Sequence, residues 1–132
     1  MEAKKQVLLV EDVPSHSILT IKFLNHCGIS NDLVTTGQEC LSYCRDKRPD
    51  LILLDIGLPD MSGIEVLQQL RTQPSYANLP IIAETAHAVY GKKEELLSLG
   101  FTDCLEKPFS IEQFTTVVRK HLPIPENKKE AD

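Results

Sequence analysis

Short runs of apolar residues recur along this chain and are bounded by charged or turn-forming residues. Residues 7–10 and 51–54 each hold four apolar residues in succession, and residues 80–83 form a similar run. A half-exposed strand alternates apolar and polar positions, whereas a parallel strand buried on both faces is apolar throughout. We therefore predict buried strands at these three runs, and weaker strands near 32–35 and 102–105.

Between the predicted strands, apolar residues recur every three or four positions, as one face of a helix requires. The first helix is predicted to begin at Pro14, a residue suited to a first helical turn, and to end before Gly28. Segment 57–63 is rich in turn residues and is predicted to be a loop. Ser110 is the predicted N-cap of the last helix. The other helices are predicted over residues 38–47, 64–70, 89–99 and 111–122.

Five strands that alternate with five helices predict an α/β fold, because right-handed connections between parallel strands place helices on both faces of the sheet. The expected architecture is a doubly wound, five-stranded parallel sheet, formed by residues 6–122 as a single domain. Residues 123–132 are charged and interrupted by proline, and we expect them to form a disordered tail.

Size and composition narrow the range of functions. The chain has 132 residues, of which 42% are hydrophobic, which is enough for one core. Its formal net charge of -5 includes no basic stripe, so we expect no direct contact with nucleic acid. No apolar segment has the length of a signal peptide or membrane span, and a soluble cytoplasmic protein is expected. The four cysteines lack zinc-site spacing and are expected to be reduced, packed thiols: Cys27, Cys40, Cys44 and Cys104.

Charged residues follow several of the predicted strands. Glu11 and Asp12 follow the first run, Asp55 follows the run 51–54, and Lys107 follows the last predicted strand. The carboxyl ends of parallel strands meet at one rim of the sheet, where open α/β sheets bind ligands. Two carboxylates about 4 Å apart repel by about 4 kcal/mol at an effective dielectric constant of about 20, so three together require a cation or a proton. Oxygen ligands with room for water favour Mg²⁺, which predicts a metal site at this rim.

The same residues lie in motifs that resemble a known family. The motifs are Glu11-Asp12, Asp55 in Leu-Leu-Asp-Ile-Gly-Leu-Pro-Asp-Met-Ser-Gly, Thr85 in Pro-Ile-Ile-Ala-Glu-Thr-Ala-His-Ala, and Lys107 in Lys-Pro-Phe. In this order they resemble the receiver domain of two-component response regulators, in particular the receivers of hybrid sensor histidine kinases. The resemblance spans nearly the whole predicted domain. It implies a flavodoxin-like fold with strand order 2-1-3-4-5.

The resemblance also implies a role for each residue of the predicted metal site. Asp12 and Asp55 are expected to bind Mg²⁺ directly, with Mn²⁺ as a substitute, Glu11 through a water molecule, and Gly57 through its backbone carbonyl. Asp55 is in addition the expected phosphoacceptor. It would take a phosphoryl group from a phosphohistidine of a sensor histidine kinase or a histidine phosphotransfer protein.

Three further positions are expected to act on the phosphoryl group. Lys107 would neutralise its charge, Thr85 would donate its hydroxyl, and His87 would modulate its hydrolysis. The new charge is expected to change the surface of the last two predicted helices and the strand between them, where a downstream protein would bind. The chain is thus expected to be a signalling phosphoacceptor rather than a turnover enzyme, and a monomer or a phosphorylation-dependent dimer.

Two other functions remain open at the level of the sequence. A phosphatase of the haloacid dehalogenase type also uses an aspartate nucleophile and Mg²⁺, but it needs Asp-x-Asp, and Gly57 stands two positions after Asp55. The other is a receiver-like docking module that no longer accepts phosphate.

Two positions depart from the family pattern. Cys104 stands three residues before Lys107, where receivers often have a tyrosine or phenylalanine that switches its rotamer. Glu84 interrupts an apolar strand immediately before Thr85, and it adds a charge near the acids unless its side chain points outward. The remaining histidines lack metal-ligand spacing and are expected at surface or capping positions: His16, His26 and His121.

Overall fold

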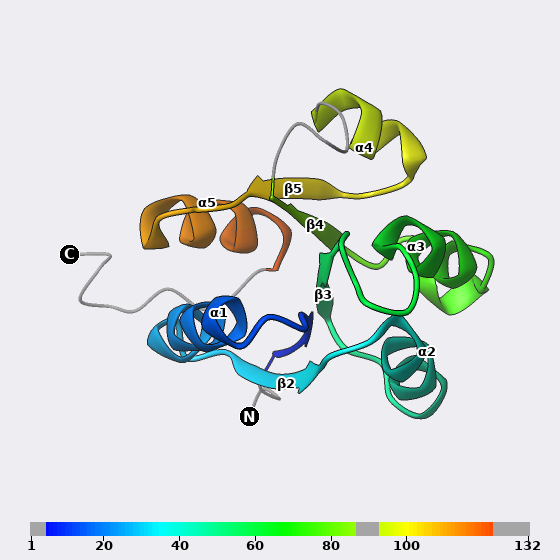
Figure 1. The fold of residues 1–132 in the computed structure, drawn as a ribbon, viewed down its shortest axis with the longest axis horizontal. Helices are drawn as coiled ribbons and strands as arrows, with labels where there is room; N and C mark the ends of the chain where they lie inside the picture. Colours follow the sequence, from blue (N-terminus) through cyan, green and yellow to red (C-terminus); the bar gives the residue numbers. More distant parts are fainter. Residues whose placement is uncertain (1–4, 87–92, 123–132) are drawn as a thin grey trace.

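A computed structural model describes residues 5–86 and 93–122 of the chain, and Figure 1 shows its ribbon. Five parallel strands form one sheet in the order β2-β1-β3-β4-β5. The predicted α/β fold and its strand order are confirmed. The strands are β1 (Gln6–Val10), β2 (Ser30–Val34), β3 (Leu51–Asp55), β4 (Ile81–Thr85) and β5 (Asp103–Glu106).

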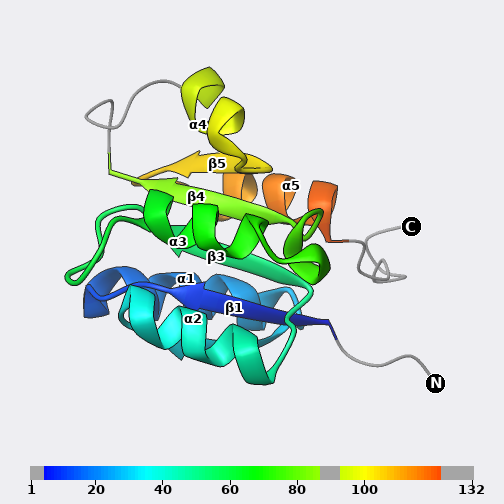
Figure 2. The ribbon, with the colours of Figure 1, turned by 90° about the vertical axis from the view of Figure 1, so that its right-hand side faces the viewer.

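Helices cover both faces of the sheet. Figure 1 shows α1 and α5 against one face and α2 and α3 against the other, while α4 lies next to β5, as the side view in Figure 2 also shows. This is the doubly wound arrangement that the sequence predicts. The described helices are α1 (Pro14–His26), α2 (Gly37–Asp46), α3 (Gly63–Arg71), α4 (Lys93–Leu99) and α5 (Ile111–His121), with a short 3-10 turn, η1 (Pro74–Tyr76).

The core consists of two apolar layers, one on each face of the sheet. Successive side chains of a strand point to opposite faces, so β1 places Leu8 and Val10 toward α2 and α3, and Val7 and Leu9 toward α1 and α5. All four side chains are fully buried. Because β1 and β3 lie inside the sheet, they are apolar on both faces, which explains the continuous runs. The edge strand β2 is only partly buried, which explains its weaker pattern.

Some boundaries differ from the predicted ones. β2 begins at Ser30, two residues earlier than predicted, β4 continues to Thr85, and η1 was not predicted. Ser110 caps α5 as predicted, within a capping box that satisfies two backbone N–H groups. Residues 89–92 of the fourth predicted helix and the predicted tail 123–132 lie outside the described residues.

The cysteines are free thiols, as predicted. Cys40 and Cys44 lie on the buried side of α2 and belong to the core, where they act as small apolar side chains. Among the helices of residues 5–86 and 93–122, none has the length and apolar character that a membrane crossing requires.

The loop between β3 and α3 brings the chain back against the end of β3. A Cβ atom built on Gly63, the first residue of α3, would lie 2.4 Å from the backbone oxygen of Asp55 and 2.9 Å from the Cα of Ile56. The backbone N–H of Gly63 donates to the carbonyl of Ile56 at 2.9 Å, which fixes this approach. The backbone of β3 can move away only by displacing Asp55, so the loop requires glycine at this point.

Gly63→Ala is expected to lower the free energy of unfolding by about 2 kcal/mol, because the added methyl group overlaps backbone atoms that cannot rotate away. Gly37→Ala is the matched control, since Gly37 is the first residue of α2 and its methyl group would meet the side chains of Met61 and Val66 rather than backbone atoms. Urea unfolding of both variants measures the difference. Equal destabilisation of the two would contradict the backbone explanation.

Candidate functional site

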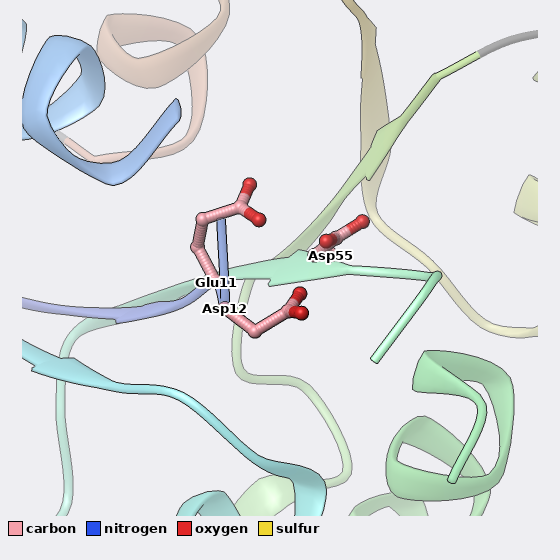
Figure 3. Close-up of side chains that lie close together, drawn as sticks. All are labelled: Glu11, Asp12 and Asp55. Atoms are coloured by element: carbon pink, nitrogen blue, oxygen red, sulfur yellow. The ribbon is translucent and has the colours of Figure 1, made fainter. Parts of the chain in front are cut away.

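Three acidic side chains gather where β1 and β3 end. Glu11 and Asp12 directly follow β1, and Asp55 is the last residue of β3. One carboxylate oxygen of each lies within 4.8 Å of the others, and Figure 3 shows the three groups close together. β1 and β3 are neighbours in the sheet, with Val10 in register with Leu54, so the residues just beyond them must be adjacent. The structure thus brings the acids together as the sequence predicts.

The acid cluster fits a small divalent cation. Oδ1 of Asp12 is buried and has no hydrogen-bond partner among the described residues, and a buried oxygen of this kind requires a partner. Glu11 is fully buried and Asp55 is 7% exposed, so water screens their charges weakly. Carboxylate oxygens close enough to share one ion are the donor set that Mg²⁺ prefers. The residues present therefore fit the predicted metal.

Lys107 reaches the acids from the loop that follows β5. Its Nζ donates a hydrogen bond to Oε1 of Glu11 and lies 3.7 Å from Oδ2 of Asp55. The backbone N–H of Lys107 donates to the carbonyl of Thr85 at 2.8 Å, which joins the loop to the end of β4. The side chain is 12% exposed. The lysine charge is therefore held at the acids rather than in solvent.

The pKa of Asp55 is raised above its ordinary value. Burial is the largest cause, because it removes water from the carboxylate, and the neighbouring Glu11 carboxyl raises the pKa further. Two groups oppose this shift: the Lys107 ammonium, and the backbone N–H of Gly57, which donates to Oδ1 of Asp55 at 3.1 Å. A divalent cation at the cluster would favour the ionised form of Asp55, which is the nucleophilic form.

The other predicted site residues lie at this rim as far as the structure describes them. Thr85 ends β4, is buried, and directly follows Glu84, which is the register partner of Asp55. Gly57 lies two residues beyond Asp55 and contacts it through the backbone bond given above. His87 lies outside the described residues, so its predicted role has no structural counterpart here.

Comparison with known proteins agrees with this geometry. The family model of the response regulator receiver domain matches residues 7–119, which is most of the chain. The chain belongs to the response regulator receiver family. The polar-differentiation response regulator DivK of Brucella anthropi is 34% identical to this receiver over 118 residues, which are 89% of this chain and 96% of that protein.

Solved structures of other receivers have the same fold. The receiver domain of the sensor histidine kinase PA1611 from Pseudomonas aeruginosa PAO1 is 32% identical with a TM-score of 0.82, over 90% of this chain and 98% of that one. That structure has a magnesium ion coordinated in its active site cleft. The chemotaxis response regulator CheY4 of Vibrio cholerae is 29% identical with a TM-score of 0.83, over 91% of this chain and 100% of that one.

Glu84 gives this receiver a fourth acid near the site. It lies two residues after Ile82 on β4 and therefore points to the same face, toward α1 and α5. Glu84 is fully buried, and neither carboxylate oxygen has a hydrogen-bond partner among the described residues. Burial raises the pKa of Glu84 to about 8; Lys107 counteracts this shift, whereas Glu11 and Asp55 add to it. The side chain thus points inward, and its charge is removed by protonation at neutral pH.

Cys104 occupies the β5 position at which receivers often have an aromatic residue. The thiol is free and half-buried, and burial raises its pKa. Together with Glu106 and Gln113 it lines an open cavity of about 900 Å³ between β5 and α5. The Cys104 side chain itself packs against the core on the face of α2 and α3, so no aromatic ring fills this position of β5.

One contact of the site was not predicted from the sequence. His16, which was expected at a surface or capping position, places Nδ1 at 3.1 Å from Nζ of Lys107 and 3.7 Å from Oε1 of Glu11. Its side chain is 46% exposed. The sequence feature that could have predicted this contact is the short segment between the acids and Pro14. A helix that begins at Pro14 places its first turn over the rim.

Glu84→Gln keeps the size of the side chain and removes its ionisable group. In the native receiver the folded state retains the Glu84 proton up to a pKa of about 8, whereas the unfolded chain releases it near 4.5. The unfolded state therefore binds fewer protons within this window, so stability falls as the pH rises, by up to about 1.4 kcal/mol per pH unit. The stability of Glu84→Gln is expected not to fall in this way as the pH rises.

Urea unfolding at several pH values within the window, without divalent cations, measures the effect. Glu65→Gln on the exposed side of α3 is the matched control, and it should keep the pH dependence of the native receiver. If the stability of the native receiver and that of Glu84→Gln changed with pH in the same way, the assignment of a protonated, buried Glu84 would be contradicted.

Proposed function

We propose that this receiver accepts a phosphoryl group on Asp55 from a phosphohistidine of a sensor histidine kinase or a histidine phosphotransfer protein. The observation that carries the proposal is the meeting of three carboxylates with one lysine at a single rim: Asp55 lies in the acid cluster, and Lys107 Nζ lies 3.7 Å from its Oδ2. A carboxylate nucleophile and a nearby fixed cation are the parts that phosphoryl transfer to an aspartate needs.

The two oxygens of Asp55 have different surroundings, which supports a division of roles. Oδ1 accepts the hydrogen bond of the Gly57 amide, which fixes the orientation of the carboxylate. Oδ2 faces Lys107, whose ammonium offsets the negative charge of an approaching phosphoryl group. Mg²⁺, when bound, supplies further positive charge at the transferred group. The phosphorus–nitrogen bond of the donor breaks as the bond to Asp55 forms, and the product is an aspartyl phosphate.

The same proposal assigns the metal ligands. Asp12 and Asp55 bind Mg²⁺ directly, Glu11 acts through a water molecule, and the backbone carbonyl of Gly57 adds a neutral oxygen; Mn²⁺ can replace Mg²⁺. The unpartnered Oδ1 of Asp12 supports its assignment as a direct ligand. The hydrogen bond from Lys107 to Oε1 of Glu11 supports an indirect role for Glu11 in metal binding.

The output is proposed to be a change of surface rather than a turnover reaction. Thr85 contacts the phosphoryl group through its hydroxyl and thereby draws the end of β4 toward the site, while His87 modulates hydrolysis. The surface of α4, β5 and α5 responds and binds a downstream protein, with the receiver acting as a monomer or as a phosphorylation-dependent dimer. The backbone bond from Lys107 to Thr85 supports this coupling, because it ties the lysine loop to β4.

Asp55→Asn is expected to abolish phosphorylation, because the amide is not a nucleophile at this position. The native receiver in Mg²⁺ should acquire label from radiolabelled acetyl phosphate and lose it in hydroxylamine, which cleaves acyl phosphates. Asp46→Asn, at the exposed end of α2, should be labelled like the native receiver. Equal labelling of Asp55→Asn would remove Asp55 from this role, and an unlabelled native receiver would favour a docking module.

Asp12→Ala is expected to weaken Mg²⁺ binding by about tenfold or more, since it removes a directly bound carboxylate. The chain contains no tryptophan, so isothermal titration calorimetry is the suitable measurement. Asp46→Ala removes an equal charge far from the cluster and should bind Mg²⁺ like the native receiver. Undiminished affinity of Asp12→Ala would show that the metal lies elsewhere.

A further inference from the structure

We propose that His16 is a positioning residue for Lys107: its imidazole keeps the lysine ammonium within reach of Asp55 while the acid cluster holds a metal. The inference rests on the phosphoacceptor function proposed above and adds a residue of α1 to that site. From the sequence alone, His16 is expected only at a surface or capping position.

The geometry defines which group donates in this contact. Nδ1 of His16 lies 3.1 Å from Nζ of Lys107. An ammonium group has donors alone, so Nδ1 is the acceptor and the ring carries its proton on Nε2. The backbone of His16 is held at the start of α1, where its N–H donates to the carbonyl of Val13 at 3.0 Å. His16 thus offers Lys107 a neutral acceptor on a rigid element.

Glu11, the other close partner of Lys107, holds the ammonium less strongly when a metal is present. Oε1 of Glu11 accepts the lysine hydrogen bond, but Glu11 also belongs to the acid cluster. A divalent cation attracts the Glu11 carboxylate and repels the ammonium, so binding of the metal weakens this ion pair.

His16 is unaffected by that competition because it is not part of the cluster. Among the described residues, the group able to hold a metal consists of the three acids without a histidine. The contact between His16 and Lys107 is therefore not weakened in this way when a metal binds. It then supplies a larger share of the side-chain restraint that keeps Lys107 at the rim.

Lys107 has space to leave Asp55 once this restraint is removed. A cavity of about 290 Å³ lies between α1 and the loop after β5, and its lining includes His16, Leu19, Lys107 and Phe109. A lysine side chain has several rotatable bonds, so an unrestrained one distributes over many rotamers. Each rotamer away from Asp55 lowers the fraction of receivers in which the ammonium can neutralise the phosphoryl group.

Two substitutions of His16 distinguish the loss of the hydrogen-bond acceptor from the loss of the volume of the ring. In His16→Asn, Oδ1 is bonded to Cγ as Nδ1 is in histidine, so an acceptor remains near Lys107. In His16→Leu, a side chain of similar size lacks any acceptor. The same change at the other end of α1, His26→Leu, alters an exposed histidine outside the site and serves as the matched control.

The first test is the maximal rate of phosphorylation by acetyl phosphate in saturating Mg²⁺. His16→Leu should lower this rate by about fivefold, the effect of losing one hydrogen bond, whereas His16→Asn and His26→Leu should stay near the native rate. A native rate in His16→Leu, or an equal loss in His16→Asn, would overturn the proposal. If His16→Leu does not fold, His16→Ala takes its place with the same criteria.

The second test does not depend on phosphorylation. Selective ¹³C labelling at lysine Cε allows the Lys107 signal to be followed by NMR, with assignment by Lys107→Arg. In Mg²⁺ the signal should move in His16→Leu and keep its native position in His16→Asn. An unmoved signal in His16→Leu would refute the positioning role even if Asp55 is phosphorylated. A moved signal in a receiver that accepts no phosphate would refute the phosphoacceptor function and leave the His16 contact standing.

Discussion

The mutual repulsion of carboxylates at one rim of the sheet is the constraint on which this site depends. Packing of the two central strands requires Val10 and Leu54 to lie side by side, and the acids that follow them are then close together. At an effective dielectric constant of about 20, each close pair costs about 4 kcal/mol. The fold tolerates the cluster because Lys107 places one positive charge in it.

One lysine does not balance the cluster, and this imbalance is what makes the rim a binding site. Glu11, Asp12 and Asp55 carry three negative charges against one, and Oδ1 of Asp12 lacks a partner among the described residues. A bound divalent cation would offset the excess negative charge and give Oδ1 of Asp12 a partner. The unbalanced acids make the fold less stable when no cation is bound and raise its affinity for a cation. This exchange is usual where buried charges serve function.

The apolar runs were sufficient to predict the buried strands, their parallel arrangement and the meeting of the acids, because each of these follows from continuous burial and right-handed connections. The strand order was predicted only from the resemblance to receivers. The inward orientation of Glu84 was not predictable in the same way. It depends on which face β4 presents one residue before its end, and a shift of one residue would reverse it. The His16 contact depends likewise on the direction in which α1 leaves the rim. The structure brings the acids and Lys107 together, but the roles of all the site residues, including Gly57, Thr85 and His87, remain predictions.

Lys107 connects parts of the receiver that are otherwise separate. Its side chain contacts Glu11 after β1, Asp55 on β3 and His16 on α1, and its backbone is bonded to Thr85 on β4. Any event that moves its ammonium toward Asp55 therefore also acts on the end of β4 and on the loop that leads into α5. Because Cys104 has no aromatic ring to switch, this loop and the pairing of β4 with β5 are the physical connections from the site to β5 and α5 within the described residues.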